Sequence, residues 1–259
     1  MLALDPLLEQ IVRDLDAMGH RALITGGAVR DALLGHEPKD FDIEVYGITY
    51  DQLAHFLGER GRVDLVGKSF GVVKFEGHDF SVPRRDSKIG THHRHFLTTF
   101  DPSITAREAA SRRDFTINAM AYDPITHEVL DFFGGREDLH NRVLRATSAA
   151  FSEDPLRVLR GMQFACRFDL TLDPATAEMS RSIAHEYSTI AKERIAEEFM
   201  KWAEKAPHPG RIAEYLRGSG WMVHFPEIER LFGVPQDPER PRQPVDLRGI
   251  AEVDRCALR

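Results

Sequence analysis

The chain has few cysteines, no long apolar run and no excess of positive charge. Its two cysteines, Cys166 and Cys256, are too few and too irregularly placed for a disulfide framework or a zinc site. No apolar run reaches membrane-spanning length, and the amphipathic, acidic segment 1–20 does not have the pattern of a signal peptide. We therefore expect reduced thiols, a cytoplasmic location and no membrane partner.

A formal net charge of −7 argues against a protein that coats nucleic acid with a generally basic surface. This net charge is compatible with a local basic groove on an otherwise acidic protein. With 259 residues, 42% of them hydrophobic, the chain can bury one large core or two modest ones. No internal repeat is present, so repeat architectures are excluded.

Hydrophobic periodicity divides the chain into a mixed first part and a helical second part. The pattern predicts helices over 5–19 and 48–61, a buried strand over 21–25, a strand over 41–46 and three short β segments between 63 and 83. From about residue 151 the strand signal ends, and four helical stretches follow with short breaks. The expected organisation is an α+β head with a mixed sheet over 1–147, a helical part over 148–233 and an irregular, proline-rich tail over 234–259.

A pair of glycines stands between the first buried strand and a short helix. Gly26 and Gly27 allow a tight turn close to a ligand. The helix that follows begins with free N–H groups and a positive dipole end, which suit phosphate. Arg30, one turn into the helix, can add a bidentate positive charge. The segment predicts a site for a nucleoside triphosphate.

Two aspartates follow within the next strand, one residue apart. Because side chains alternate along a strand, Asp40 and Asp42 share one face while Phe41 and Ile43 point into the core. Carboxylates roughly 6 to 7 Å apart repel each other unless a cation lies between them, so the pair is a natural Mg²⁺ site. The alternative is a surface turn with solvated aspartates; the glycine turn and helix just before them favour the metal site.

These motifs resemble the class II branch of the polymerase β-type nucleotidyltransferases, the tRNA CCA-adding enzymes and bacterial poly(A) polymerases. The resemblance covers residues 22 to about 234. It rests on five segments in the family's order and spacing, GGAVRDALLG, KDFDIEVYG, SRRDFTINAMAYD, DFFGGREDL and EDPLRVLR. It implies a catalytic head, a helical neck and part of an RNA-binding body. It also implies Mg²⁺-dependent transfer of CMP and AMP from CTP and ATP to the 3′ end of tRNA, with release of pyrophosphate.

The resemblance assigns roles to further residues. Asp40 and Asp42 match the two metal-bridging carboxylates, and Asp79 is the best match for the third catalytic carboxylate. Arg113 is implied to contact the triphosphate or its ribose, supported by Asp114 and Asn118. The alternative for Ser111 to Met120 is a helix with a solvated basic start and with Phe115, Ile117 and Met120 in the core.

A template for the base is implied in EDPLRVLR. We expect Asp154, Arg157 and Arg160 on adjoining positions of one helix, the first two matching the hydrogen-bonding edge of the base and Arg160 adding a further contact. The alternative is an ordinary helix start with an ion pair. Gln163 departs from the family, which usually has an arginine there.

Two segments are less specific. The basic run from Arg84 to His95 is expected to be a solvated loop, with RNA-phosphate contact as the alternative; its adjacent histidines lack the spacing of a zinc site. After Val234 the sequence departs from the family, consistent with a natural truncation or a fragment. A poly(A) polymerase or partial CC- or A-adding enzyme is the first rival function. A truncated, weakly active RNA-binding protein is the second, favoured if loss of the family's distal helices prevents tRNA binding.

Overall fold

The structure is a computed structural model that describes residues 2–38, 40–65, 71–88 and 96–230. The chain forms two compact units, Met1–Glu137 and Asp138–Arg259. The first is called the head below and the second the helical unit. The expected tail over 234–259 lies outside the described residues. Within the described part of the chain, no helix is long and apolar enough to cross a membrane.

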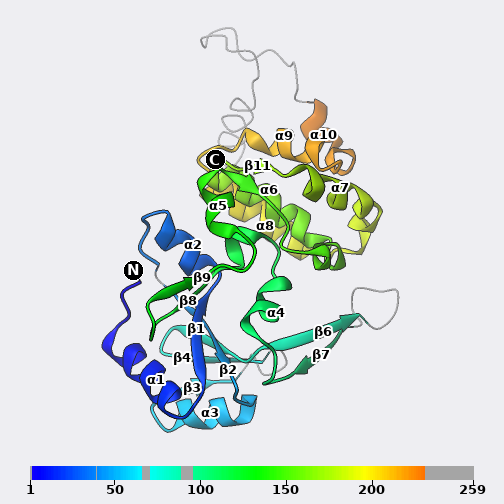
Figure 1. Ribbon diagram of the computed structural model, residues 1–259. Helices are drawn as coiled ribbons and strands as arrows, with labels where there is room; N and C mark the ends of the chain where they lie inside the picture. Colours follow the sequence, from blue (N-terminus) through cyan, green and yellow to red (C-terminus); the bar gives the residue numbers. More distant parts are fainter. Residues whose placement is uncertain (1, 39, 66–70, 89–95, 231–259) are drawn as a thin grey trace. The chain divides into compact units, whose positions relative to one another are not determined.

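A mixed β-sheet forms the centre of the head (Figure 1). Its strand order is β3-β4-β5-β2-β1-β8-β9. Neighbouring strands in this order pair antiparallel, except that β2 and β5 pair in parallel. This mixed sheet confirms the expected α+β head. The strands are β1 (Arg21–Thr25), β2 (Asp42–Tyr46), β3 (Val63–Asp64), β4 (Val72–Phe75), β5 (His78–Ser81), β8 (Ala121–Asp123) and β9 (Glu128–Leu130).

Two capped helices cover this sheet, and both lie within the ranges that the sequence predicts. Helix α1 (Pro6–Ala17) starts because the Asp5 side chain accepts the Leu8 N–H at 2.9 Å and proline occupies the first turn. Its buried side chains pack on β1. Helix α3 (Tyr50–Gly58) starts with a capping box between Thr49 and Gln52 and packs on β3 and β4. Both helices therefore hold the apolar face of the sheet away from water.

The helix considered for Ser111 to Met120 is not formed. Helix α4 (Ala106–Ser111) ends there, and a one-turn 3₁₀ helix, η2 (Thr116–Asn118), leads into β8. The Asp114 carboxylate accepts hydrogen bonds from the Phe115 N–H at 2.8 Å and from the Asn118 amide at 3.1 Å, which replace helical backbone bonds. The core positions are confirmed, since Phe115, Ile117 and Met120 are fully buried.

The basic run is in part a strand, so the expectation of a loop was wrong for its first residues. Strand β6 (Arg84–Lys88) pairs antiparallel with β7 (Phe96–Phe100). The polar sequence of β6 has little strand preference of its own, so the sequence pattern did not reveal this strand. The histidines of the run, His92, His93 and His95, lie outside the described residues.

The helical unit is built around α6 (Leu156–Phe168), which packs on α8 (Lys192–Lys205) and α9 (Arg211–Gly218). A short parallel pair, β10 (Val143–Leu144) with β11 (Thr171–Leu172), corrects the expectation that strands end near residue 151. Arg145 supports this pair, because its guanidinium binds Asp173 at 2.6 Å just after β11. The remaining elements of the helical unit are η3 (Ala149–Glu153), α7 (Pro174–Ser182), η4 (Ala184–Thr189), η5 (Met222–His224) and α10 (Pro226–Arg230).

The head also contains α2 (Gly27–Leu33), and α5 (Gly135–His140) begins in the head and ends in the helical unit.

Candidate active site

A row of directly opposed residues crosses the head sheet. In strand order it contains Asp64, Lys74, Asp79, Asp42, Thr25 and Ala121. Cross-strand partners project from the same face of a sheet, with neighbouring strands about 4.8 Å apart. The parallel pairing of β2 with β5 therefore brings Asp42 beside Asp79, although these two aspartates are 37 positions apart in the sequence.

Three candidate carboxylates line one pocket of about 530 Å³. Asp40 and Asp42 are exposed, whereas Phe41 and Ile43 are buried, so the expected alternation along this segment is confirmed. Asp79 lines the same pocket from β5. The other lining residues are Gly27, Ala28, Asp31, Pro38, Phe41, Lys74 and Gly77.

The electrostatics of the pocket disfavour an uncompensated negative charge on Asp42. Loss of hydration raises the pKa of this carboxyl above its ordinary value, and the nearby Asp79 and Asp40 raise it further. The Arg113 guanidinium acts in the opposite direction. A cation bound in the pocket would relieve this repulsion.

The donor set fits a magnesium ion. Among the described residues, no cluster of three or more Asp, Glu, His or Cys side chains is preassembled around a single metal position. Mg²⁺ does not need one, since it usually takes one or two carboxylates and completes its octahedron with water and substrate phosphates. Asp40 and Asp42 supply two such carboxylates at the wall of the pocket.

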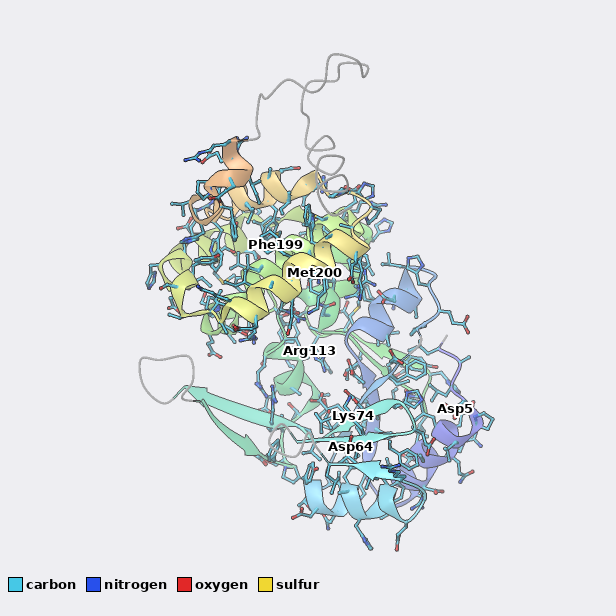
Figure 2. The ribbon with its side chains drawn as sticks, turned by 180° about the vertical axis from the view of Figure 1, so that it is seen from behind. Asp5, Asp64, Lys74, Arg113, Phe199 and Met200 are labelled. Carbon is cyan, nitrogen blue, oxygen red and sulfur yellow. The ribbon has the colours of Figure 1, made fainter. Side chains whose placement is uncertain are left out.

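Arg113 reaches the same end of β1 and β2 from the segment after α4 (Figure 2). Its guanidinium donates a hydrogen bond to Thr25 Oγ1 at 2.8 Å and lies 4.0 Å from Glu44 Oε2. The side chain is 29% exposed, so it keeps access to solvent and to a ligand. Arg113 thus lies beside Thr25, the residue next to Asp42 in the row.

Gly26 permits this approach of Arg113. The residue has φ 72° and ψ −129°, a conformation that side chains rarely adopt. A Cβ atom added at this position would lie 2.8 Å from Arg113 Nη1 and 3.8 Å from Asp42 Oδ2. Gly27, which lines the pocket, would place a Cβ 3.4 Å from the Arg30 guanidinium.

Gly26→Ala should displace the Arg113 guanidinium and strain the backbone. We expect a loss of about 1–3 kcal/mol in the free energy of unfolding. We also expect roughly tenfold weaker triphosphate binding, because a charge-assisted contact is misplaced. Gly35→Ala is the matched control, since Gly35 also has a positive φ (79°) but nothing lies within 4 Å of an added Cβ. Equal nucleotide affinity in the two folded variants, measured by calorimetry, would contradict this role for Gly26.

Arg30 lies deeper than the sequence indicates. Its side chain is 5% exposed and pairs with Asp31 at 2.7 Å. The Arg30 Nη1 group donates a hydrogen bond to Asn118 Oδ1 at 2.5 Å, and the Asn118 amide in turn donates one to the Asp114 carboxylate. Arg30 therefore links α2 to the segment that follows Arg113.

In the helical unit, the three template candidates do not share a helix. Asp154 has an extended backbone and precedes α6, where its carboxylate accepts the Leu156 N–H at 3.0 Å and lies 3.4 Å from the Arg194 guanidinium. Helix α6 begins at Leu156 because Pro155 favours its first turn. Arg157 and Arg160 lie on α6, and Arg157 donates to the Ala150 carbonyl at 2.8 Å. The expectation of one helical face was wrong for Asp154.

Sequence reasoning missed three residues around the carboxylates. Glu44 follows Asp42 by two residues on the same strand face, a spacing that could have revealed it. Lys74 pairs with Asp79 at 2.7 Å, and only the strand register shows this. His78 accepts the Phe41 N–H at 3.3 Å, stacks on the Phe41 ring and lies 3.5 Å from Asp5 Oδ2, so it fastens the segment between Asp40 and Asp42 to the start of α1.

Comparisons with known proteins identify the family to which the chain is similar. Residues 22–145 match the family described as "Poly A polymerase head domain", and residues 169–232 match "Probable RNA and SrmB- binding site of polymerase A". The multifunctional CCA protein of Paracidovorax citrulli (strain AAC00-1) is 40% identical over 225 residues, which cover 83% of this chain and 52% of that protein. The corresponding protein of Acidovorax sp. (strain JS42) is 38% identical over the same shares.

Solved structures show the same fold. The Bacillus stearothermophilus CCA-adding enzyme in complex with CTP has a TM-score of 0.70 and 27% identity, covering 84% of this chain and 53% of that chain. The Thermotoga maritima CCA-adding enzyme complexed with tRNA CCA has a TM-score of 0.69 and 27% identity, covering 86% and 54%. The chain spans about half the length of these relatives. The resemblance drawn from the motifs is confirmed, and the chain belongs to the family that unites the CCA-adding enzymes with the poly(A) polymerases.

Proposed function

We propose that this protein is a Mg²⁺-dependent nucleotidyltransferase that adds CMP and AMP, from CTP and ATP, to the 3′ end of tRNA in the cytoplasm. The observation that carries the proposal is the row in which Asp79 and Asp42 stand side by side, with Arg113 held at Thr25. The row supplies carboxylates that can bind cations, and the adjacent Arg113 supplies a guanidinium that can bind phosphate. Nucleotidyl transfer requires both. Relatives named for CCA addition, and solved relatives in complex with CTP and with tRNA, support the substrates.

The head residues divide the work by position. Asp40 and Asp42 hold the metal, and Asp79 supplies the third carboxylate beside the attacking 3′-hydroxyl. A bound Mg²⁺ would supply the positive charge that makes this hydroxyl more acidic and that offsets the negative charge of the leaving phosphates. Arg113 binds the triphosphate or its ribose, and Gly27 lets the nucleotide approach the backbone at the pocket wall. Because Arg30 is buried against Asn118, it acts by fixing the position of the Arg113 segment.

A direct assay separates this function from its rivals. The protein is incubated with tRNA lacking its CCA end and with each labelled nucleotide separately, then with both. Addition of C followed by A supports the proposal. Addition of A alone indicates a poly(A) polymerase or an A-adding enzyme, the alternative that the family name favours. Addition of C alone indicates a CC-adding enzyme, and tRNA binding without addition indicates an RNA-binding protein.

Base selection is assigned in this proposal to Asp154 and Arg157, with Arg160 as a further contact. A polar contact to a base edge is worth about 1–3 kcal/mol of discrimination. Asp154→Asn combined with Arg157→Gln should therefore reduce the preference between CTP and ATP roughly ten- to hundredfold, with a smaller change in triphosphate affinity. Asparagine keeps an acceptor for the Leu156 N–H, which preserves the start of α6.

The control for this variant is Arg194→Met, which removes the ion pair to Asp154 without changing Asp154 itself. Competition assays with both nucleotides give the selectivity of each variant. Wild-type selectivity in the double variant, or an equal loss in Arg194→Met, would show that these residues only stabilise the start of the helix.

A further inference from the structure

The carboxylate row contains one positive charge that the proposed function does not use. Lys74 lies on β4, directly opposite Asp64 on one side and Asp79 on the other. Its ammonium group is 2.7 Å from Asp79 Oδ1. Figure 2 shows Lys74 and Asp64 on their adjacent strands. Of the described residues that line the carboxylate pocket, Lys74 alone is cationic.

The pair between Lys74 and Asp79 has two consequences for ligands of the pocket. A divalent cation that enters alone is repelled by the ammonium group and finds one oxygen of Asp79 already engaged. A nucleoside triphosphate brings several negative charges, which attract the same ammonium group. Lys74 therefore repels the divalent cation and attracts the nucleoside triphosphate.

The side chain is able to change partners. Lys74 is 56% exposed and Asp79 is 40% exposed, so their ion pair is screened by water and is easily exchanged. A lysine carries a compact charge with three donors on a flexible four-carbon stem. It can leave the carboxylate for a phosphate without any movement of the strand.

We propose that Lys74 is a built-in counter-ion of the active site, which weakens binding of a divalent cation alone and strengthens binding of the nucleoside triphosphate. The cation then binds more weakly in the absence of the nucleotide than it would without Lys74. This inference rests on the proposed function, because it requires that the carboxylate pocket binds both ligands.

Two binding measurements test the proposal without a catalytic readout. Free Mn²⁺ is followed by electron paramagnetic resonance during titration of the protein without nucleotide, and a non-reactive CTP analogue is titrated by calorimetry at saturating Mg²⁺. In Lys74→Met, Mn²⁺ affinity should rise about three- to tenfold and analogue affinity should fall about three- to tenfold, as expected for one removed charge near each ligand. Lys74→Arg should stay close to wild type in both titrations.

Lys192→Met provides the matched control, because it removes the same side chain from an exposed position at the start of α8 in the helical unit. It should leave both affinities unchanged. Unchanged or weaker Mn²⁺ binding in a folded Lys74→Met variant overturns the inference, even when the wild-type protein transfers nucleotides as proposed. Absence of Mn²⁺ binding by the wild-type protein even with the CTP analogue present overturns both the inference and the metal-dependent function, so the two failures are distinguishable.

Discussion

Asp42→Asn should reduce nucleotide transfer by roughly 10³-fold or more, equivalent to at least about 4 kcal/mol of activation barrier. Asparagine keeps the size of the side chain but removes the charge that, in the proposed function, holds the cation, so the loss is expected in chemistry and not in folding. Single-turnover rates in Mg²⁺ with primed tRNA measure the effect. Asp51→Asn, which changes an exposed carboxylate on α3, is the control and should keep wild-type rates. Ordinary turnover by folded Asp42→Asn would remove Asp42 from the metal site.

The same variant should gain stability at neutral pH in the absence of metal. The pKa of Asp42 is raised in the folded state, mainly by loss of hydration, with Asp79 and Asp40 adding to it. Ionisation is then less favourable in the folded than in the unfolded chain, so this group destabilises the fold as pH rises from the ordinary value of 3.8 through the raised value. Asparagine removes the penalty above that interval and changes nothing below it. Thermal melts between pH 3 and pH 7 should show a difference that grows with pH, and the reverse trend would contradict this account.

Arg113→Gln should lower kcat/KM for both CTP and ATP by about a hundredfold, the cost of removing a positioned donor to a charged substrate. Loss with both nucleotides is expected because the proposed function assigns Arg113 to the triphosphate or its ribose and not to the base; its guanidinium lies beside Gly26 and Thr25. Arg107→Gln changes an exposed arginine of α4 whose guanidinium lies over the Phe133 ring, and should have little effect. A loss confined to one nucleotide would place Arg113 at the base instead.

Short-range patterns predicted the parts of the head that local chemistry determines. The starts of α1 and α3 follow from their capping residues, and the alternation of Phe41 and Ile43 with the aspartates follows from strand geometry. The prediction for the segment after Ser111 was wrong because its conformation depends on the Asp114 carboxylate. This carboxylate accepts a hydrogen bond from Asn118, and Asn118 accepts one from Arg30, 88 residues away from Asn118 along the chain. Local propensity contains no information about such a network.

Hydrophobic periodicity alone could not predict that Asp79 lies beside Asp42. The resemblance to a family identified it, but the spacing of residues could not, because its distance from Asp42 depends on which strands become neighbours. The pairing of Lys74 with Asp79 has the same origin, since it depends on the register between β4 and β5. Strand β11 was missed because a two-residue strand is too short to show alternation.

The parallel pairing of β2 and β5 also determines when the site can assemble during folding. Strands β1 and β2 form an antiparallel pair, whereas pairing of β5 with β2 closes a long loop that contains α3, β3 and β4. Long-range parallel contacts form slowly, so the carboxylates of Asp42 and Asp79 come together late on the folding pathway. Ile43 and Phe80, which pair in the same register and are fully buried, supply the apolar attraction at that step. The repulsion between the two aspartates therefore arises next to a buried hydrophobic contact of the same strand pair, which offsets it.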